Sequence, residues 1–344
     1  METNTKLLLV LLVLAVAVVT AMFVSAVFQI IAIFLIAIFF AYILSPAVSA
    51  LESKGFPRVL GAILIFILFF GAIGVSFYIL APEIGEQAAA LREKISVGGI
   101  RNAIKGIDAF FNNNLAFLGV KKWHVAPKIE AWLGVIFDNI LNIAGGIVGL
   151  VIYSIMTLFA TFFLLKDGPG LKKAVINVVP NRFFEMTLSI FDKIDWSLGA
   201  YLRGILLDAF IIGNVTTLAM WLIGVPNFTL IGLFAGVFNL IPYLGPPSGA
   251  LMASIVSVIT TGTFDQIPLI LFVFAMIRLL DDVVVQPLTI SKSVQMHPLT
   301  VIFALLIGAE LYGIIGMLFA VPVAGIIKVI LSEFYFGLQR YHSI

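Results

Sequence analysis

The sequence predicts an all-α polytopic membrane protein, and two observations support this fold class. Hydrophobic residues make up 62% of the 344-residue chain and charged residues only 11%, against about 25% charged residues in an ordinary soluble domain. The apolar residues form continuous runs of about 20 or more, as membrane-spanning helices need, and not the short alternating segments of a β-barrel. The net charge of +2 gives no argument for a nucleic-acid partner.

The residue inventory also limits the chemistry. The chain has no cysteine and only three histidines, far apart in the sequence, so we expect no disulfide, no thiol nucleophile and no metal site. The sequence contains no GxSxG, HExxH or Walker-type phosphate-binding motif. We therefore expect neither an enzyme nor an ATP-driven protein, and no cofactor.

Charges and helix breakers divide the chain into about eight membrane segments. We expect the first two helices at 7–25 and 28–45, because no charge occurs between Lys6 and Glu52. They pack as a hairpin that turns near Ser25–Gln29, an interpretation that we prefer to a cleaved signal peptide.

The next two helices flank the largest polar stretch. Helix three is expected at 59–81, ended by Pro82, and helix four at 139–165, bounded by charges. Within 82–138, apolar residues recur at spacings of three and four, which is the period of an amphipathic helix. We interpret this insertion as an extracytoplasmic helical cap, with a lid or an oligomer contact as the alternative.

The rest of the chain, 139–344, carries segments four to eight. A polar loop at 166–202 is expected on the cytoplasmic side, followed by a transport core at 201–331. In that core, helix five runs from Tyr201 to about Gly224 and helix seven occupies 266–287. Lys and Arg near the helix ends predict that both termini lie in the cytoplasm.

Segments six and eight, at 227–262 and 298–331, are too long for one span and contain glycine and proline. Segment six reads NLIPYLGPPSG at 239–249. Proline has no N–H and its ring clashes with the preceding turn, and broken backbone at membrane depth needs protein or water around it. We prefer a re-entrant hairpin with its tip at 242–247 to one kinked helix. Paired interruptions indicate a transporter's binding site, unless they only serve packing.

The interruptions supply most of the candidate site residues. Broken helices present free N–H or C=O groups and their dipoles to a polar solute or ion. The candidate substrate-binding residues are Asn239, Pro242, Tyr243, Gly245, Pro246, Gln286 and Pro287. The candidate hinge residues are Pro298, Gly313, Gly316 and Pro322.

Ionisable residues at membrane depth are costly and indicate function by default. Arg278 can reach Asp281 at i+3 and Asp282 at i+4 on one helical face. We expect it to neutralise one carboxylate and to leave the other for a proton, a cation or a solute hydroxyl, unless the group is a structural ion pair. The candidates for ion or proton coupling are Asp208, Arg278, Asp281, Asp282 and Glu310.

Longer motifs resemble one family. NLIPYLGPPSG and the stretch DDVVVQPLTISKSVQMHPLTVIFALLIGAELYGIIGMLFAVPVAGIIKVIL resemble the C-terminal region of the autoinducer-2 exporter family, and AYILSPAVSALESKGFPR and FFLLKDGPGLKKAVINVVP resemble its loops. The matching motif positions are Pro242, Gly245, Pro246, Pro287, His297, Pro298, Gly313, Gly316 and Pro322. The chain departs from the family pattern at Ile205, where relatives often have glutamine, and at Asp208, an added charge.

The resemblance implies a plasma-membrane protein that exports small solutes such as autoinducer-2. It also implies a homo-oligomer, a pentamer above all, and exchange of sodium or lithium for protons in some relatives. We therefore expect a secondary transporter that exports a small polar organic solute. The alternatives are a sodium or lithium/proton antiporter and, more remotely, a membrane scaffold. The expected partners are the lipid bilayer, the solute or a monovalent cation, and further copies of the chain.

Overall fold

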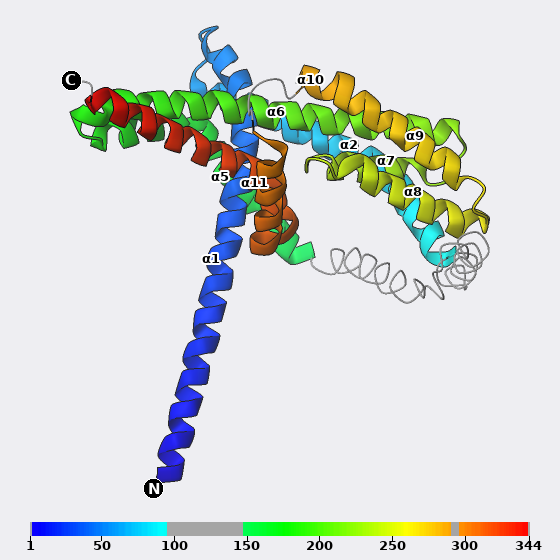
Figure 1. Ribbon diagram of the computed structural model, residues 1–344, viewed down its shortest axis with the longest axis horizontal. Coiled ribbons are helices and arrows are strands. Elements are labelled where there is room, and N and C mark those ends of the chain that lie inside the picture. Colours follow the sequence, from blue (N-terminus) through cyan, green and yellow to red (C-terminus); the bar gives the residue numbers. More distant parts are fainter. Residues whose placement is uncertain (1, 95–146, 290–295, 343–344) are drawn as a thin grey trace. The chain divides into compact units, whose positions relative to one another are not determined.

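The structure is a computed structural model that describes residues 2–94, 147–289 and 296–342. Within these ranges every regular element is a helix and none is a strand, which confirms the all-α fold class. The helices form two compact units, which we describe separately (Figure 1). The first unit holds Met1–Ile65 and Val148–Val178, and the second holds Phe66–Ile147 and Val179–Ile344.

The first helix, α1 (Glu2–Glu52), is continuous. The predicted hairpin with a turn near Ser25–Gln29 is therefore wrong. That stretch contains neither glycine nor proline, so no residue in it interrupts the helical hydrogen bonds. After α1 the chain turns tightly at Gly55, whose φ of +92° is a conformation that glycine adopts without steric cost.

In the first unit, α1 and the start of α2 (Arg58–Lys94) contact α5 (Ile147–Val178). Arg58 Nε donates to the carbonyl of Leu165 at 3.0 Å, and the Arg58 guanidinium pairs with Glu52 at 2.7 Å. Thr161, fully buried, lies with its Oγ1 3.5 Å from the carbonyl of Ala37. These side chains tie the polar turn after α1 to the middle of α5.

Three helices run further than the sequence predicts. α2 continues through Pro82 to Lys94, and the rest of the predicted insertion lies outside the described residues. α5 continues through Pro169 to Val178, although the start of predicted helix four also lies outside them. The predicted loop at 166–202 is wrong, because α6 (Phe184–Leu222) already begins there. Charges end an apolar stretch, but Lys and Glu are good helix formers and do not end a helix.

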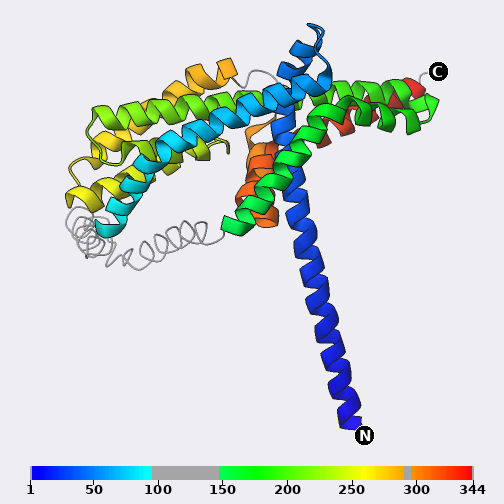
Figure 2. The same cartoon turned by 180° about the vertical axis from the view of Figure 1, so that it is seen from behind.

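The second unit is built around α6. α7 (Phe228–Phe238), α8 (Gly245–Thr261) and α9 (Ile267–Leu280) lie along its C-terminal part, as two opposite views show (Figures 1 and 2). Their shared apolar core contains Ile212, Met220, Ile231, Val256, Ile270 and Phe274. The N-terminal part of α6 contacts α11 (Pro298–His342), where Lys193 pairs with Glu333 and Ser189 Oγ donates to Glu333 at 3.0 Å.

Glycines bring α6 and α7 into backbone contact. A Cβ at Gly236 would lie 3.0 Å from the carbonyl oxygen of Ala209, and one at Gly232 would lie 2.8 Å from that of Gly213. Gly232 and Gly236 are four residues apart, and glycines at this spacing form the close-packing face of membrane helices. Any side chain on this face would push α7 away from α6.

Segment six forms a helical hairpin. α7 and α8 are separate helices, joined by residues 239–244. Asn239 lies against Gly245, and Ala235 lies against Gly249, so the two helices are antiparallel neighbours. The structure therefore has the preferred hairpin and not one kinked helix. Each arm is too short to cross a hydrocarbon core of about 30 Å with a rise of about 1.5 Å per residue.

Segment eight also folds back on itself. The backbone of α11 leaves helical geometry at Tyr312 and Gly313, where Gly313 has φ +59° and ψ −136°. A Cβ at Gly308 would lie 2.4 Å from the carbonyl oxygen of Gly316. The two parts of α11, before and after the break, are therefore in backbone contact. Of the other predicted hinge positions, Pro298 begins α11 and Pro322 lies inside its continuous second part.

The end of α2 caps the start of α7. Thr229 Oγ1 donates to Glu83 Oε1 at 2.7 Å, and Gln87 Oε1 accepts from the backbone N–H of Leu230 at 3.2 Å. Asn227 Nδ2 donates to the backbone carbonyl of Gln87 at 2.8 Å. The first N–H groups of a helix have no partner in that helix, and here the neighbouring helix supplies an acceptor. We call these five residues the α2–α7 cap.

Helix length and apolarity fit a membrane location. Four helices among the described residues are long and apolar enough to cross a bilayer, and α7 is a shorter apolar helix. They cover Val27–Glu52, Arg58–Gln87, Asn181–Leu222 and Pro298–Tyr335. The chain is thus an all-α polytopic membrane protein.

Candidate functional site

Three polar side chains meet in the apolar interior of the second unit. Asp208 comes from α6, Asn239 from the end of α7, and Asp281 from the end of α9. Their exposed fractions are 2%, 5% and 0%. Burying a carboxyl group away from water is costly unless it is paired or hydrogen-bonded, so the contacts of these groups decide what the cluster can do.

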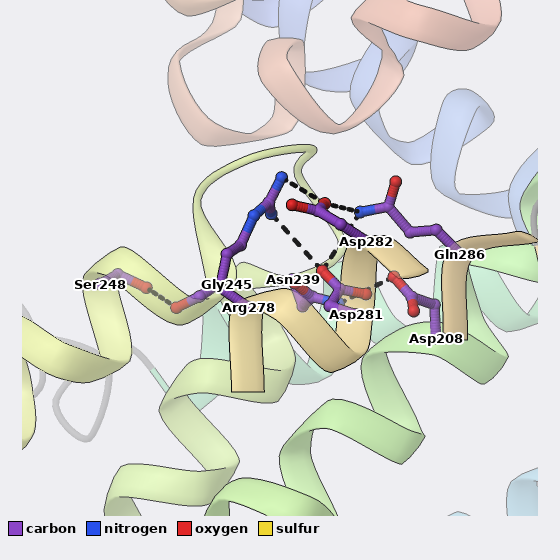
Figure 3. Close-up of polar contacts among 8 residues, drawn as sticks. All are labelled: Asp208, Asn239, Gly245, Ser248, Arg278, Asp281, Asp282 and Gln286. Carbon is purple, nitrogen blue, oxygen red and sulfur yellow. Dashed lines mark hydrogen bonds and ion pairs between the residues drawn. The ribbon is translucent and has the colours of Figure 1, made fainter. Parts of the chain in front are cut away.

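Asp208 and Asp281 are partners across the interface between α6 and α9. Figure 3 shows their two carboxyl groups close to each other. Two buried carboxyl groups so close together repel each other when both are ionised, which favours a proton on one of them. No donor of the described residues reaches Oδ1 of either carboxyl. The pair is therefore a candidate site for one exchangeable proton.

Asn239 links this carboxyl pair to the break between α7 and α8. Its Nδ2 donates to Asp208 Oδ2 at 2.8 Å. Its side chain also fills the space beside Gly245, where an added Cβ would lie 2.1 Å from Asn239 Oδ1. The small residue at 245 is therefore needed for Asn239 to reach Asp208.

On the open side of the pair, Arg278 contacts two aspartates. Its guanidinium lies 3.5 Å from Asp281 Oδ2 and 2.7 Å from Asp282 Oδ1. The predicted i+3 and i+4 contacts are thus both present. Asp281 is buried and the Asp282 side chain is 45% exposed, so Asp282 forms the exposed end of the ion pair.

A π-helical turn at Asp281–Val285 orients the side chains of Asp281 and Gln286 toward each other. Gln286 Nε2 donates to Asp281 Oδ2 at 3.2 Å across a spacing of five residues. In an α-helix, residues five apart point about 140° away from each other, whereas a π turn brings them to the same side. Such turns are often found at functional sites.

The break itself carries backbone strain. Tyr243 has φ +70°, a left-handed conformation that costs a non-glycine residue about 1–3 kcal/mol. Its ring lies under the guanidinium of Arg278, with 5.5 Å between the Arg278 Cζ and the ring centroid. Tyr243 is 42% exposed and Pro242 half-buried, so the break reaches the surface beside the carboxyl cluster.

The structure brings together most of the predicted site residues. Asn239, Tyr243, Gly245 and Gln286 lie around the predicted coupling residues Asp208, Arg278, Asp281 and Asp282. Pro242 and Pro246 belong to the break, and Pro287 follows Gln286 in α10 (Gln286–Thr289). Glu310 does not join the cluster, because it is exposed on α11 two residues before that helix breaks.

Tyr201 was missed by the sequence reasoning. It is buried on α6, and no described residue bonds to its hydroxyl. The signal that could have found it is its spacing of seven residues from Asp208, which places both on one face of a helix.

With this geometry in view, the comparison with protein families is decisive. The family model described as AI-2E family transporter matches residues 7–336. The chain belongs to the AI-2E transporter family. This membership makes the protein a membrane transporter, with the buried cluster inside its second unit.

Curated relatives agree with this assignment. The AI-2E chain is 30% identical over 300 residues to "Putative transport protein YrrI" of Bacillus subtilis (strain 168), covering 86% of this chain and 84% of the relative. It is 26% identical over 298 residues to "Putative permease PerM" of Escherichia coli (strain K12), covering 85% and 83%. Both similarities extend over most of each protein, so they concern whole transporters and not a shared fragment.

The AI-2E chain also has an apolar groove of about 530 Å³ between α6 and α9. Its lining includes Val215, Ala219, Val273, Met276, Ile277 and Val283. None of the polar side chains of the cluster lines it. A polar solute would lose its hydrogen bonds to water there without replacement, so the groove is not the candidate solute site.

Proposed function

We propose that this AI-2E family transporter is a secondary transporter that exports a small polar organic solute, with autoinducer-2 as the first candidate. The observation that carries the proposal is the break at 239–244, which lies beside a buried polar cluster. Broken helices with polar groups at the break are typical solute sites in secondary transporters. The proposal requires no chemical change of the solute.

Few backbone donors are left free at the break. The N–H groups of Asn239, Leu240 and Ile241 bond to carbonyl groups in the last turn of α7, and Pro246 and Pro247 have no N–H in the first turn of α8. Donors come instead from side chains at the rim, namely Arg278, Gln286 and the hydroxyl of Tyr243. A neutral solute with several hydroxyl groups, which both donate and accept, suits this arrangement better than an anion does.

We further infer that the Asp208–Asp281 pair couples transport to a proton gradient. Two buried carboxyl groups close to each other favour a shared proton, and both have an oxygen that no described donor reaches. Buried ionisable groups of this kind mark proton pathways in membrane proteins. Asp282, Arg278 and Gln286 then connect the pair to the exposed side.

The location and assembly of the chain complete the proposal. We place the chain in the cell membrane. Lys and Arg near the helix ends favour an orientation with both termini in the cytoplasm, which puts the insertion at 82–138 outside. The resemblance to the exporter family favours a homo-oligomer, a pentamer first. Apolar side chains such as Ile67, Phe77 and Phe210 are exposed in the single chain and would face lipid or a further copy.

One observation favours a second candidate function. Two carboxyl groups with unpartnered oxygens can exchange their proton for a small cation, because oxygen ligands suit hard cations. A sodium or lithium/proton antiporter would use the same pair without an organic solute. A non-transporting scaffold would need neither the buried pair nor the break.

Transport by the purified chain in proteoliposomes tests these functions. Labelled autoinducer-2 is the organic probe, a pH gradient is imposed, and an internal pH dye reports proton movement. We expect gradient-driven movement of the label, lost in Asp281→Asn and retained in the control variant Asp265→Asn, whose exposed carboxyl lies in the turn after α8. A pH change on adding sodium or lithium, without movement of the label, would support the antiporter instead. If neither signal appears in the wild type, both transport proposals fail for these substrates.

A further inference from the structure

The break between α7 and α8 is attached to the carboxyl pair at both of its ends. At its start, Asn239 donates to Asp208 at 2.8 Å. Near its far end, the Tyr243 ring lies under Arg278, which contacts Asp281 at 3.5 Å. Each aspartate of the pair is therefore linked to a different end of the same six-residue turn, 239–244.

The backbone of this turn is held away from its relaxed form. The left-handed conformation of Tyr243, with φ +70°, persists only where surrounding contacts impose it. The stacking of Arg278 on the ring is such a contact, because the face of an aromatic ring attracts a guanidinium. Loss of this contact removes one restraint on the strained backbone.

We propose that the α7–α8 break is a two-state element whose conformation is set by the proton on the Asp208–Asp281 pair. This inference rests on one part of the proposed function, namely that the Asp208–Asp281 pair binds the proton. With the proton present, the pair stays closed and both attachments hold. When the proton leaves, the two carboxylates repel each other and Arg278 is drawn more strongly to the aspartates. Tyr243 then loses its cation and its strained conformation relaxes.

The charged and titratable neighbours of the pair all fit this scheme. From α9 and the π turn the pair faces Arg278 and Asp282, and Arg278 in turn contacts the ring of Tyr243. On α6, buried Tyr201 shares a helix face with Asp208. Arg278 is the only cation among these neighbours, and it also holds the break. Loss of the proton therefore changes the balance at the residue that restrains Tyr243.

The conformation of the break can be followed without a transport assay. The chain has no cysteine, so a single introduced cysteine is the only thiol that a maleimide can label. We would compare the maleimide reactivity of Leu244→Cys, in the break, with that of Thr263→Cys, in the exposed turn at the other end of α8. The purified full chain in detergent is measured across a pH series. The ratio of the two rates removes the intrinsic ionisation of the thiol.

We expect this ratio to change with pH through a single transition, by about tenfold, the effect of a modest shift in a two-state equilibrium. Asp208→Asn and Asn239→Leu, each in the Leu244→Cys background, should abolish the transition, and Asp265→Asn, at an exposed carboxyl in the turn after α8, should keep it. A ratio that stays constant with pH, or a transition that survives in both Asp208→Asn and Asn239→Leu, would overturn the proposal. Size-exclusion profiles identify variants that fail to fold, and Asp281→Asn then replaces Asp208→Asn. The readout is independent of whether the chosen solute is transported.

Discussion

Asn239, the residue that follows α7, donates a hydrogen bond from its side-chain amide to the carboxyl of Asp208 on α6, with 2.8 Å between Nδ2 and Oδ2. This single contact joins a broken membrane segment to a buried acid. It also leaves no room for a Cβ at the neighbouring position, because the Asn239 side chain lies against Gly245.

Replacing Asn239 by leucine should destabilise the protein. The substitution leaves Oδ2 of buried Asp208 without its donor, at a cost of about 1–3 kcal/mol. Thermal unfolding in detergent measures the effect. Asn214→Leu is the matched control, because the Asn214 amide donates to a carbonyl of its own helix and the residue is exposed. Equal shifts for the two variants would contradict a special role of the Asp208 contact.

Arg278 should not be replaceable by lysine without loss. Its guanidinium reaches Asp281, Asp282 and the Tyr243 ring at once, whereas an ammonium is a point charge without the planar fork. We expect Arg278→Lys to keep part of the proton-coupled transport and Arg278→Gln to abolish it, in proteoliposomes under a pH gradient. Full activity of the glutamine variant would show that the pair needs no cation.

The α6–α7 contact should depend on Gly236. In Gly236→Ala the new Cβ would lie 3.0 Å from both the Ala209 oxygen and the Gly213 Cα, so the helices must separate. We expect a loss of about 1–3 kcal/mol, the usual cost of overpacking. Gly74→Ala is the control, because nothing lies within 4 Å of that site and alanine is the better helix former. Unfolding midpoints should fall for the first variant and not for the second.

The α2–α7 cap predicts a specific cross-link. Glu83 Oε1 lies 2.7 Å from Thr229 Oγ1, so a short bifunctional thiol reagent should join the pair Glu83→Cys and Thr229→Cys within one chain. Glu83→Cys with Ser248→Cys should not react, because Ser248 lies near the other end of α7, about 16 Å further along at about 1.5 Å per residue. Mass spectrometry of digested protein distinguishes the two outcomes. Cross-linking of the control pair would mean that α2 does not lie at the start of α7.

Sequence patterns found the features that depend on local spacing. The contacts of Arg278 with Asp281 and Asp282 follow from helical geometry, and the hairpin of segment six follows from prolines 242, 246 and 247. The predictions failed where a charged residue, or an apolar stretch longer than one membrane span, was taken to mark the end of a helix. α1 runs through the expected turn, and α5 and α6 occupy the expected loop.

The meeting of Asp208 with Asp281 was beyond sequence reasoning. The two residues stand on helices far apart in the chain, and only the packing of α9 on α6 brings them together. The π turn was also hidden, because DDVVVQ has the composition of an ordinary helix. Its presence depends on the contacts that Asp281 and Gln286 make.

The π turn holds one residue more than an α-helix needs to bring Asp281 and Gln286 to the same side. If one residue of 283–285 were removed and the turn became α-helical, the two side chains would be four residues apart and about 40° from each other. Gln286 would therefore stay beside Asp281 after such a deletion. The turn thus works like a local insertion that the helix absorbs without rotating the side chains that follow it.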